Sequence, residues 1–189
     1  RVAKAQGLTI VPPFHEELVR GVATYAFELF SQTPGLDTVY VPIGCGSGVC
    51  GTILARDALG LKTKVVGVVS DHAQTAKLSV ETGKLIETPS ASTFADGMAV
   101  RVPVREAFEI YSKGCERIVS VSDDAIASAI RTYYTTTHNL AEGAGAAPLA
   151  ALMQEKDRMR GKRVGVILCG GNIDTDWFRQ VMAGETPVV

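Results

Sequence analysis

Two spacings of apolar residues alternate along the chain and predict strands that are followed by helices. Short runs of apolar and β-branched residues predict buried strands at 8–11, 37–43, 64–69, 117–121 and 163–168. Apolar residues three or four positions apart predict helices at 16–30, 52–59, 73–82, 105–112, 123–135, 144–159 and 174–182. Strands that are apolar throughout are typical of a parallel sheet with both faces covered. The pattern therefore predicts an α/β fold, an open, mostly parallel twisted sheet with helices on both faces.

Several predicted elements carry the residues that begin or end them. Pro12 and Pro13 end the first strand, because proline cannot donate to a sheet ladder. Gly83 is placed to end one helix in the left-handed conformation, and Ser122 to cap the start of another. Between 84 and 103 the periodicity is lost, which indicates a long functional loop or irregular structure over a site.

The segment 44–51 reads Gly-Cys-Gly-Ser-Gly-Val-Cys-Gly and joins a predicted strand to a predicted helix. Glycine lets the backbone turn with positive φ and approach a ligand, and a helix N-terminus presents free N–H groups to an anion. The segment therefore predicts a phosphate site. It also contains the G-x-G-x-x-G pattern of dinucleotide-binding folds, with Asp71 as the candidate ribose-binding acid, but this pattern is common in α/β proteins. A nicotinamide or flavin cofactor, and a glycine turn without a ligand, remain as alternatives.

Composition and charge disfavour several other classes of function. The 189 residues carry a formal net charge of −1 and are 46% hydrophobic, which is typical of one globular domain and not of a nucleic-acid-binding surface. No apolar run approaches the roughly 20 residues that cross a bilayer, so no membrane partner is expected. The four cysteines lack the spacing of metal ligands and indicate reduced thiols in a cytoplasmic protein. The start at Arg1, without Met, suggests a fragment or a processed chain.

Three later segments join the glycine loop in one ordered set of motifs. Thr-Phe-Ala-Asp-Gly stands at 93–97, Ala-Glu-Gly-Ala-Gly at 141–145 and Cys-Gly-Gly-Asn at 169–172. The set resembles the fold-type II pyridoxal-phosphate enzymes, in particular the threonine/serine dehydratase and serine racemase group, whose stretches read P-V-G-G-G-G-L, T-I-A-D-G, E-P-A-G-A and S-G-G-N. The resemblance runs from about Gly7 to the C-terminus. It implies pyridoxal 5′-phosphate as the cofactor.

The resemblance also implies a role for each motif residue. The implied cofactor-binding residues are Gly44, Cys45, Gly46, Ser47, Gly48, Gly97, Glu142, Cys169, Gly170 and Asn172. Residues 44–48 would bind the phosphate, Cys169 would face the pyridine nitrogen, and Asn172 would organise the loop around Cys169. Gly97 and Glu142 would lie near the ring. Two alternatives stay open: Cys169 as an ordinary buried thiol, and Glu142 as a charge at a helix N-terminus.

Several aromatic residues, and two positions where the resembling family can bind a metal, have no predicted place in the site. Tyr25, Phe27 and Phe30 are expected to pack the helix at 16–30. Val69 and Thr75 stand where some members of the resembling family place metal-binding acids, so no metal is expected there.

Two segments of the family have no counterpart in this chain. These are the S-x-K-x-R-G type segment with the Schiff-base lysine and the S-x-G-N-H segment that holds the substrate carboxylate. The resemblance therefore implies that residues 1–189 are the C-terminal part of a catalytic domain that binds pyridoxal phosphate. The N-terminal part and the small domain would be absent. No catalytic residue is expected in this chain, and the chain alone is expected to be inactive.

The activity that the resemblance implies is that of an ammonia-lyase. Such an enzyme removes water and ammonia from a small hydroxy amino acid of the threonine or serine type and leaves a 2-oxo acid. β-Replacement, as in cysteine synthase or threonine synthase, and amino-acid racemisation are alternatives within the same cofactor class. A phosphate-metabolite binding module without catalysis is the alternative from another class. The implied partners are a small amino-acid substrate, the missing N-terminal portion of the enzyme and further copies of the chain in a homo-oligomer.

Overall fold

Most of the apolar runs pair side by side and form a single parallel sheet. The computed structural model describes all residues from Arg1 to Val189. Its strands are β1 (Thr38–Pro42), β2 (Lys64–Ser70), β3 (Cys115–Val121) and β4 (Val164–Val166). They lie in the order β3-β2-β1-β4, and every neighbouring pair is parallel. The carboxyl ends of all the strands therefore meet at one edge of the sheet, where ligands of such folds bind.

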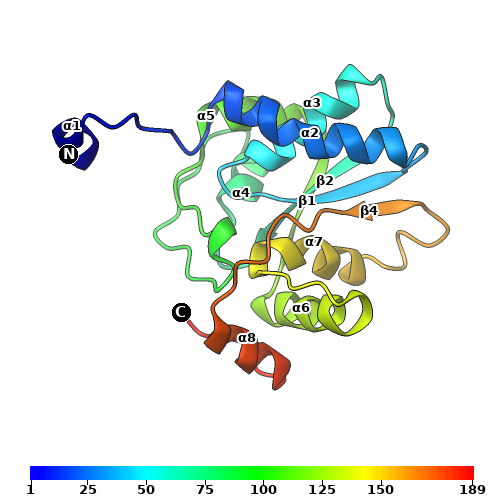
Figure 1. Cartoon of the computed structure of the whole chain (residues 1–189). Coiled ribbons are helices and arrows are strands. Elements are labelled where there is room, and N and C mark those ends of the chain that lie inside the picture. Colours follow the sequence, from blue (N-terminus) through cyan, green and yellow to red (C-terminus); the bar gives the residue numbers. More distant parts are fainter.

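Helices cover both faces of this sheet (Figure 1). The helices of the chain are α1 (Val2–Gln6), α2 (Glu16–Gln32), α3 (Ser47–Ala58), α4 (Thr75–Thr82), α5 (Arg105–Gly114), α6 (Asp123–Thr137), α7 (Gly143–Gln154) and α8 (Thr175–Met182), with a short 3-10 turn η1 (Asp96–Met98). Of these, α1 lies away from the sheet and buries no residue. One hydrophobic cluster joins α2, α3 and α5 to the sheet, and a second joins α6 and α7 to its other face. The predicted α/β fold is confirmed. None of the helices combines the length and the apolar character needed to cross a membrane.

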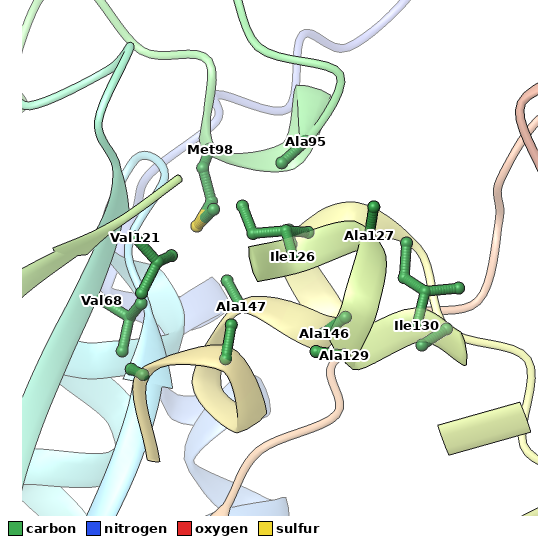
Figure 2. Close-up of a cluster of buried hydrophobic side chains, with 14 of the residues drawn as sticks. Val68, Ala95, Met98, Val121, Ile126, Ala127, Ala129, Ile130, Ala146 and Ala147 are labelled. Carbon is green, nitrogen blue, oxygen red and sulfur yellow. The ribbon is translucent and has the colours of Figure 1, made fainter. Parts of the chain in front are cut away.

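The core beneath η1 holds this turn at the edge of the sheet that carries the strand ends. Ala95 and Met98, on either side of Gly97, belong to the same buried cluster as Ile126 of α6 (Figure 2). Small residues allow this close packing, since a Cβ on Gly143 would lie only 2.6 Å from the Cα of Ala95. The turn that carries Gly97 is therefore fixed against the N-terminus of α7.

The predicted strand at 8–11 is wrong. These residues form no strand, and their side chains are exposed, with 75% of Ile10 accessible to solvent. A strand is stable only when its backbone N–H and C=O groups find partners, and no strand of this chain pairs with the segment. The segment connects α1, a short helix that the pattern did not predict, to α2 (Figure 1).

A partly buried ion pair holds the end of α7 against the sheet. Arg117 of β3 forms two hydrogen bonds to the carboxylate of Glu155, and Tyr40 of β1 donates to Oε2 of Glu155 at 2.5 Å. Burial opposes the ionisation of Glu155, but the hydrogen bonds from Arg117 and Tyr40 outweigh it and hold the pKa of Glu155 below its usual value. The helix predicted at 144–159 ends at Gln154, directly before Glu155.

Tyr133 of α6 carries a buried hydroxyl that has no hydrogen-bond partner in the chain. Burial, and then the nearby Cys169, raises the pKa of Tyr133 to about 12. We expect Tyr133→Phe to raise the free energy of unfolding by about 1 kcal/mol, because it removes an unpaired polar group and keeps the ring. Urea denaturation measures the difference. The matched variant Tyr40→Phe loses its hydrogen bond to Glu155 and is expected to be destabilised. A loss of stability in both variants would contradict the prediction.

Candidate cofactor site

A cavity of about 610 Å³ at the carboxyl ends of β1 and β4 collects most of the predicted site residues. The predicted residues that line it are Gly44, Cys45, Gly46, Ser47, Gly48, Gly97, Glu142 and Cys169. Gly170 and Asn172 are not part of the lining. Segments far apart in the sequence thus meet at one place, as the parallel strand order requires.

The glycine loop presents a row of unpaired backbone donors at this cavity. Gly46, at φ +102°, turns the chain from β1 into α3. None of the backbone N–H groups of residues 44–49 donates to an acceptor in the chain. Free N–H groups at the N-terminus of a 12-residue helix form an anion site, because they lie at the positive end of the helix dipole. The loop therefore fits a phosphate group such as that of pyridoxal 5′-phosphate.

Glycine is required where the loop meets the turn η1. A Cβ on Gly44 would overlap the carbonyl oxygen of Gly97. A Cβ on Gly97 would lie 2.9 Å from the Cβ of Ala144 in α7. These approaches fix the glycine loop, η1 and the N-terminus of α7 against one another, so the cavity has a rigid frame.

Glu142 and Cys169 place an acid and a thiol in the same cavity. Burial, and then the charge of Asp96, raises the pKa of Glu142. Burial, and then Glu142, raises the pKa of Cys169 to about 11, so this residue is a neutral thiol near pH 7. Cys169 is exposed to the cavity and is not an inert core thiol. Glu142 also occupies the N-cap position of α7, where its side chain makes no capping hydrogen bond.

Gly170 and Asn172 lie outside the lining for different reasons. Gly170 accepts a hydrogen bond from the backbone N–H of Glu142 at 3.0 Å, and a Cβ on Gly170 would overlap the Glu142 carboxylate. Gly170 thus holds the backbone of Glu142 and leaves room for its carboxylate. Asn172 is exposed, and the structure gives its side chain no hydrogen bond within the chain. Its role in organising the Cys169 loop stays a prediction.

Tyr25 of α2 lines the cavity, although the sequence pattern assigned it to helix packing. Of its two companions in that assignment, Phe30 is buried and Phe27 is 51% exposed. The Tyr25 hydroxyl donates to the carbonyl oxygen of Gly48 at 3.0 Å. The signal in the sequence that could have indicated this contact is the pair Gly48 and Gly51, which leaves one face of α3 without side chains.

The cavity has no cationic side chain, and Glu142 is the one charged residue in its lining. None of the lysines of the chain lines it. The capacity of this chain to hold an anion at the site therefore rests on main-chain N–H groups.

A dinucleotide does not fit this arrangement. Asp71, the candidate ribose-binding acid, lies in a separate cavity with His72 and Gln74. Gly51, the last glycine of the G-x-G-x-x-G pattern, packs against α2, where its Cβ would lie 3.0 Å from the backbone N of Ala23. The elements of that pattern thus do not converge on one ligand. No group of three or more His, Cys, Asp or Glu residues is arranged to hold a metal ion.

Comparison with known proteins gives matches along nearly the whole chain. Residues 1–170 match the family described as "Pyridoxal-phosphate dependent enzyme". L-threonine ammonia-lyase of Thermotoga maritima is 30% identical over 183 residues, which are 96% of this chain and 45% of that protein. Serine racemase of Schizosaccharomyces pombe is 27% identical over 183 residues, which are 96% of this chain and 57% of that protein. The chain thus spans about half the length of the curated relatives it matches.

A solved structure of a similar enzyme has the same fold. The crystal structure of the T.th. threonine deaminase superposes with a TM-score of 0.86 at 30% sequence identity. The match covers 92% of this chain and 65% of that one.

Proposed function

The chain belongs to the pyridoxal-phosphate-dependent enzymes of fold type II, and from this we propose that it is the cofactor-binding part of an ammonia-lyase. The proposed reaction removes water and ammonia from a small hydroxy amino acid of the threonine or serine type and leaves a 2-oxo acid. The observation that carries the proposal is the row of unpaired N–H groups at 44–48, in one cavity with Glu142 and Cys169. Relatives named L-threonine ammonia-lyase and L-threo-3-hydroxyaspartate ammonia-lyase support the reaction class.

Each part of the cavity has a task in this proposal. Pyridoxal 5′-phosphate, when bound, supplies a conjugated ring that withdraws electrons from the α-carbon of the substrate. The N–H groups of residues 44–48 bind its phosphate, and the Ser47 hydroxyl adds a further donor. Cys169 faces the pyridine nitrogen as a neutral thiol, which forms no ion pair that would keep a proton on this nitrogen. Gly97 and Glu142 lie beside the ring.

A lysine from outside residues 1–189 completes the site in this proposal, because no amine of this chain reaches the cavity. Residues 1–189 then form the C-terminal part of a catalytic domain, and its N-terminal part is their partner. We extend the proposal to a homo-oligomer, in line with the family resemblance. The cysteines form no disulfide, which supports a reducing, cytoplasmic compartment.

Racemisation is a second candidate, because one relative of similar coverage is named serine racemase. The two reactions start from the same amino acid and differ in their products. An ammonia-lyase releases a 2-oxo acid and ammonia, whereas a racemase gives the D-amino acid. Incubation of the longest natural form of the protein with L-threonine and L-serine, with both kinds of product measured, decides between them.

We expect residues 1–189 to bind pyridoxal 5′-phosphate and not to turn over L-threonine or L-serine. Inorganic phosphate should compete, because it would occupy the same N–H groups. Calorimetric titration measures binding, and 2-oxo acid release measures turnover. Failure to bind pyridoxal 5′-phosphate would contradict the cofactor role. Turnover by the 189 residues alone would contradict the need for a lysine from elsewhere.

A further inference from the structure

Tyr25 of α2 reaches the first turn of α3 with a side-chain hydrogen bond. Its hydroxyl donates to the carbonyl oxygen of Gly48 at 3.0 Å and lies 2.9 Å from Oγ1 of Thr52. Thr52 also donates to the Gly48 carbonyl at 2.9 Å, but from within α3. The phenol therefore ties α2 to the part of α3 that carries the unpaired donors.

Two glycines on one face of α3 make this contact possible. Gly48 and Gly51 stand three positions apart and so share the face that packs against α2. A Cβ on Gly48 would lie 3.5 Å from the Tyr25 hydroxyl, and one on Gly51 would lie 3.1 Å from the Cα of Ala23. Because neither residue has a side chain, the two helices approach until the phenol reaches the Gly48 carbonyl.

Fixing the Gly48 carbonyl also restrains a donor of the anion site. The carbonyl and the N–H of Gly48 flank the same Cα, and this residue lines the cavity with its N–H unpaired. Helix ends fray, and the N–H groups of residues 44–49 have no acceptor in the chain that would hold them in place. Burial raises the pKa of Tyr25, so the phenol keeps the proton that it donates. The Tyr25 hydrogen bond thus restrains the first turn of α3, the part of this helix that would otherwise fray.

We propose that Tyr25 is a positioning residue, which holds the first turn of α3 in the conformation that binds the phosphate of pyridoxal 5′-phosphate. The inference rests on the proposed cofactor site and adds a residue of α2 to it. Donors that are ordered before the ligand arrives lose less conformational freedom on binding, and affinity rises accordingly. The contribution should be that of about one hydrogen bond, or roughly three- to tenfold in affinity.

Tyr25→Phe removes the hydroxyl and keeps the ring. For the 189-residue chain we expect the Kd for pyridoxal 5′-phosphate to rise roughly three- to tenfold. The Kd for pyridoxal, which lacks the phosphate, should stay the same. Each single variant keeps one hydroxyl donor to the Gly48 carbonyl. Thr52→Val keeps the Tyr25 hydroxyl, and Tyr25→Phe keeps the Thr52 hydroxyl. Only the double variant removes both hydroxyl donors to Gly48, so its fold-loss of affinity should exceed the product of the two single fold-losses. If the two substitutions acted independently through packing, the fold-loss of the double variant would equal that product.

The control is Tyr134→Phe, the same chemical change at a tyrosine of α6 that is 41% exposed and does not line the cavity. It should leave both affinities unchanged, and circular dichroism confirms that each variant is folded. An unchanged affinity of Tyr25→Phe for pyridoxal 5′-phosphate, or equal losses for pyridoxal, would overturn this inference alone. Failure of the unsubstituted chain to bind pyridoxal 5′-phosphate would overturn the proposed function, and this inference with it.

Discussion

Gly46→Ala is expected to lower the affinity for pyridoxal 5′-phosphate by about 100-fold or more. Gly46 has a φ of +102°, a conformation that costs a residue with a side chain about 1–3 kcal/mol. The new Cβ would also lie 2.8 Å from the Cβ of Ala107 in α5, so the loop and α5 could not both keep their positions. Because the N–H groups of residues 44–48 are proposed to bind the phosphate together, a shift of the loop removes several donors at once. Calorimetric titration of both proteins measures the loss.

Gly60→Ala is the matched control for this substitution. Gly60 also has a positive φ, +63°, but nothing lies within 4 Å of its would-be Cβ. It does not line the cavity. We expect this variant to lose about 1 kcal/mol of stability and no affinity for pyridoxal 5′-phosphate. If the two variants lost equal affinity, backbone strain at either end of α3 would be enough to disturb the loop. That result would contradict the explanation that the effect of Gly46→Ala is local.

Arg117→Met is expected to lower the free energy of unfolding by about 3 kcal/mol, the largest effect on stability that we predict. The substitution removes the nearer of the two cations beside the Glu155 carboxylate, whose side chain is only 14% exposed. The remaining cation, Arg158, lies 3.7 Å away and is 55% exposed. Urea denaturation at pH 7 measures the change. Arg20→Met is the control, since Arg20 and its partner Glu16 are both mostly exposed, and it should cost less than about 0.5 kcal/mol. A loss below about 1 kcal/mol for Arg117→Met would contradict the prediction.

The effect of Arg117→Met should also depend on pH. The pKa of Glu155 lies below its ordinary value of 4.5 in the folded protein, so the carboxylate contributes stability that is fully present above that value. This contribution is lost as the pH falls through the folded pKa. The difference in stability between the unsubstituted chain and Arg117→Met should therefore be largest near neutral pH and shrink below about pH 4. A difference that stays constant down to about pH 3 would contradict the assignment.

The sheet and the glycine loop could be predicted from the sequence because both depend on local features. A buried strand shows as an apolar run, and a tight turn into a helix shows as glycine at alternate positions. The convergence of the loop with Cys169 also follows, because both lie after parallel strands whose carboxyl ends share one edge. The start of α3 at Ser47, inside the glycine-rich segment, did not follow, since packing against α2 outweighs the low helix propensity of glycine.

Residues 8–11 show where local reading failed, and Tyr25 shows where it was incomplete, because this ring packs as predicted and also reaches the cavity. The apolar run at 8–11 has the composition of a strand, but strand formation needs a partner, and partners are set by the tertiary arrangement. Tyr25 stands at a helical apolar position, and nothing in its neighbourhood of the sequence distinguishes a ring that packs from one that reaches a carbonyl 23 residues away. The error at 8–11 and the contact missed at Tyr25 both concern segments that are distant along the chain.

A phosphate site built from main-chain N–H groups has a consequence for how such proteins diverge. Every residue except proline carries this donor, so most positions of the loop can exchange side chains without changing the number of donors. Cys45 and Ser47 stand where the resembling family has glycine, and both still line the cavity with their neighbours. Gly44 and Gly46 must stay glycine because neighbouring atoms fill the space that a side chain would need. The loop can therefore drift in composition over evolutionary time while the path of its backbone, and with it the binding of the phosphate, is retained.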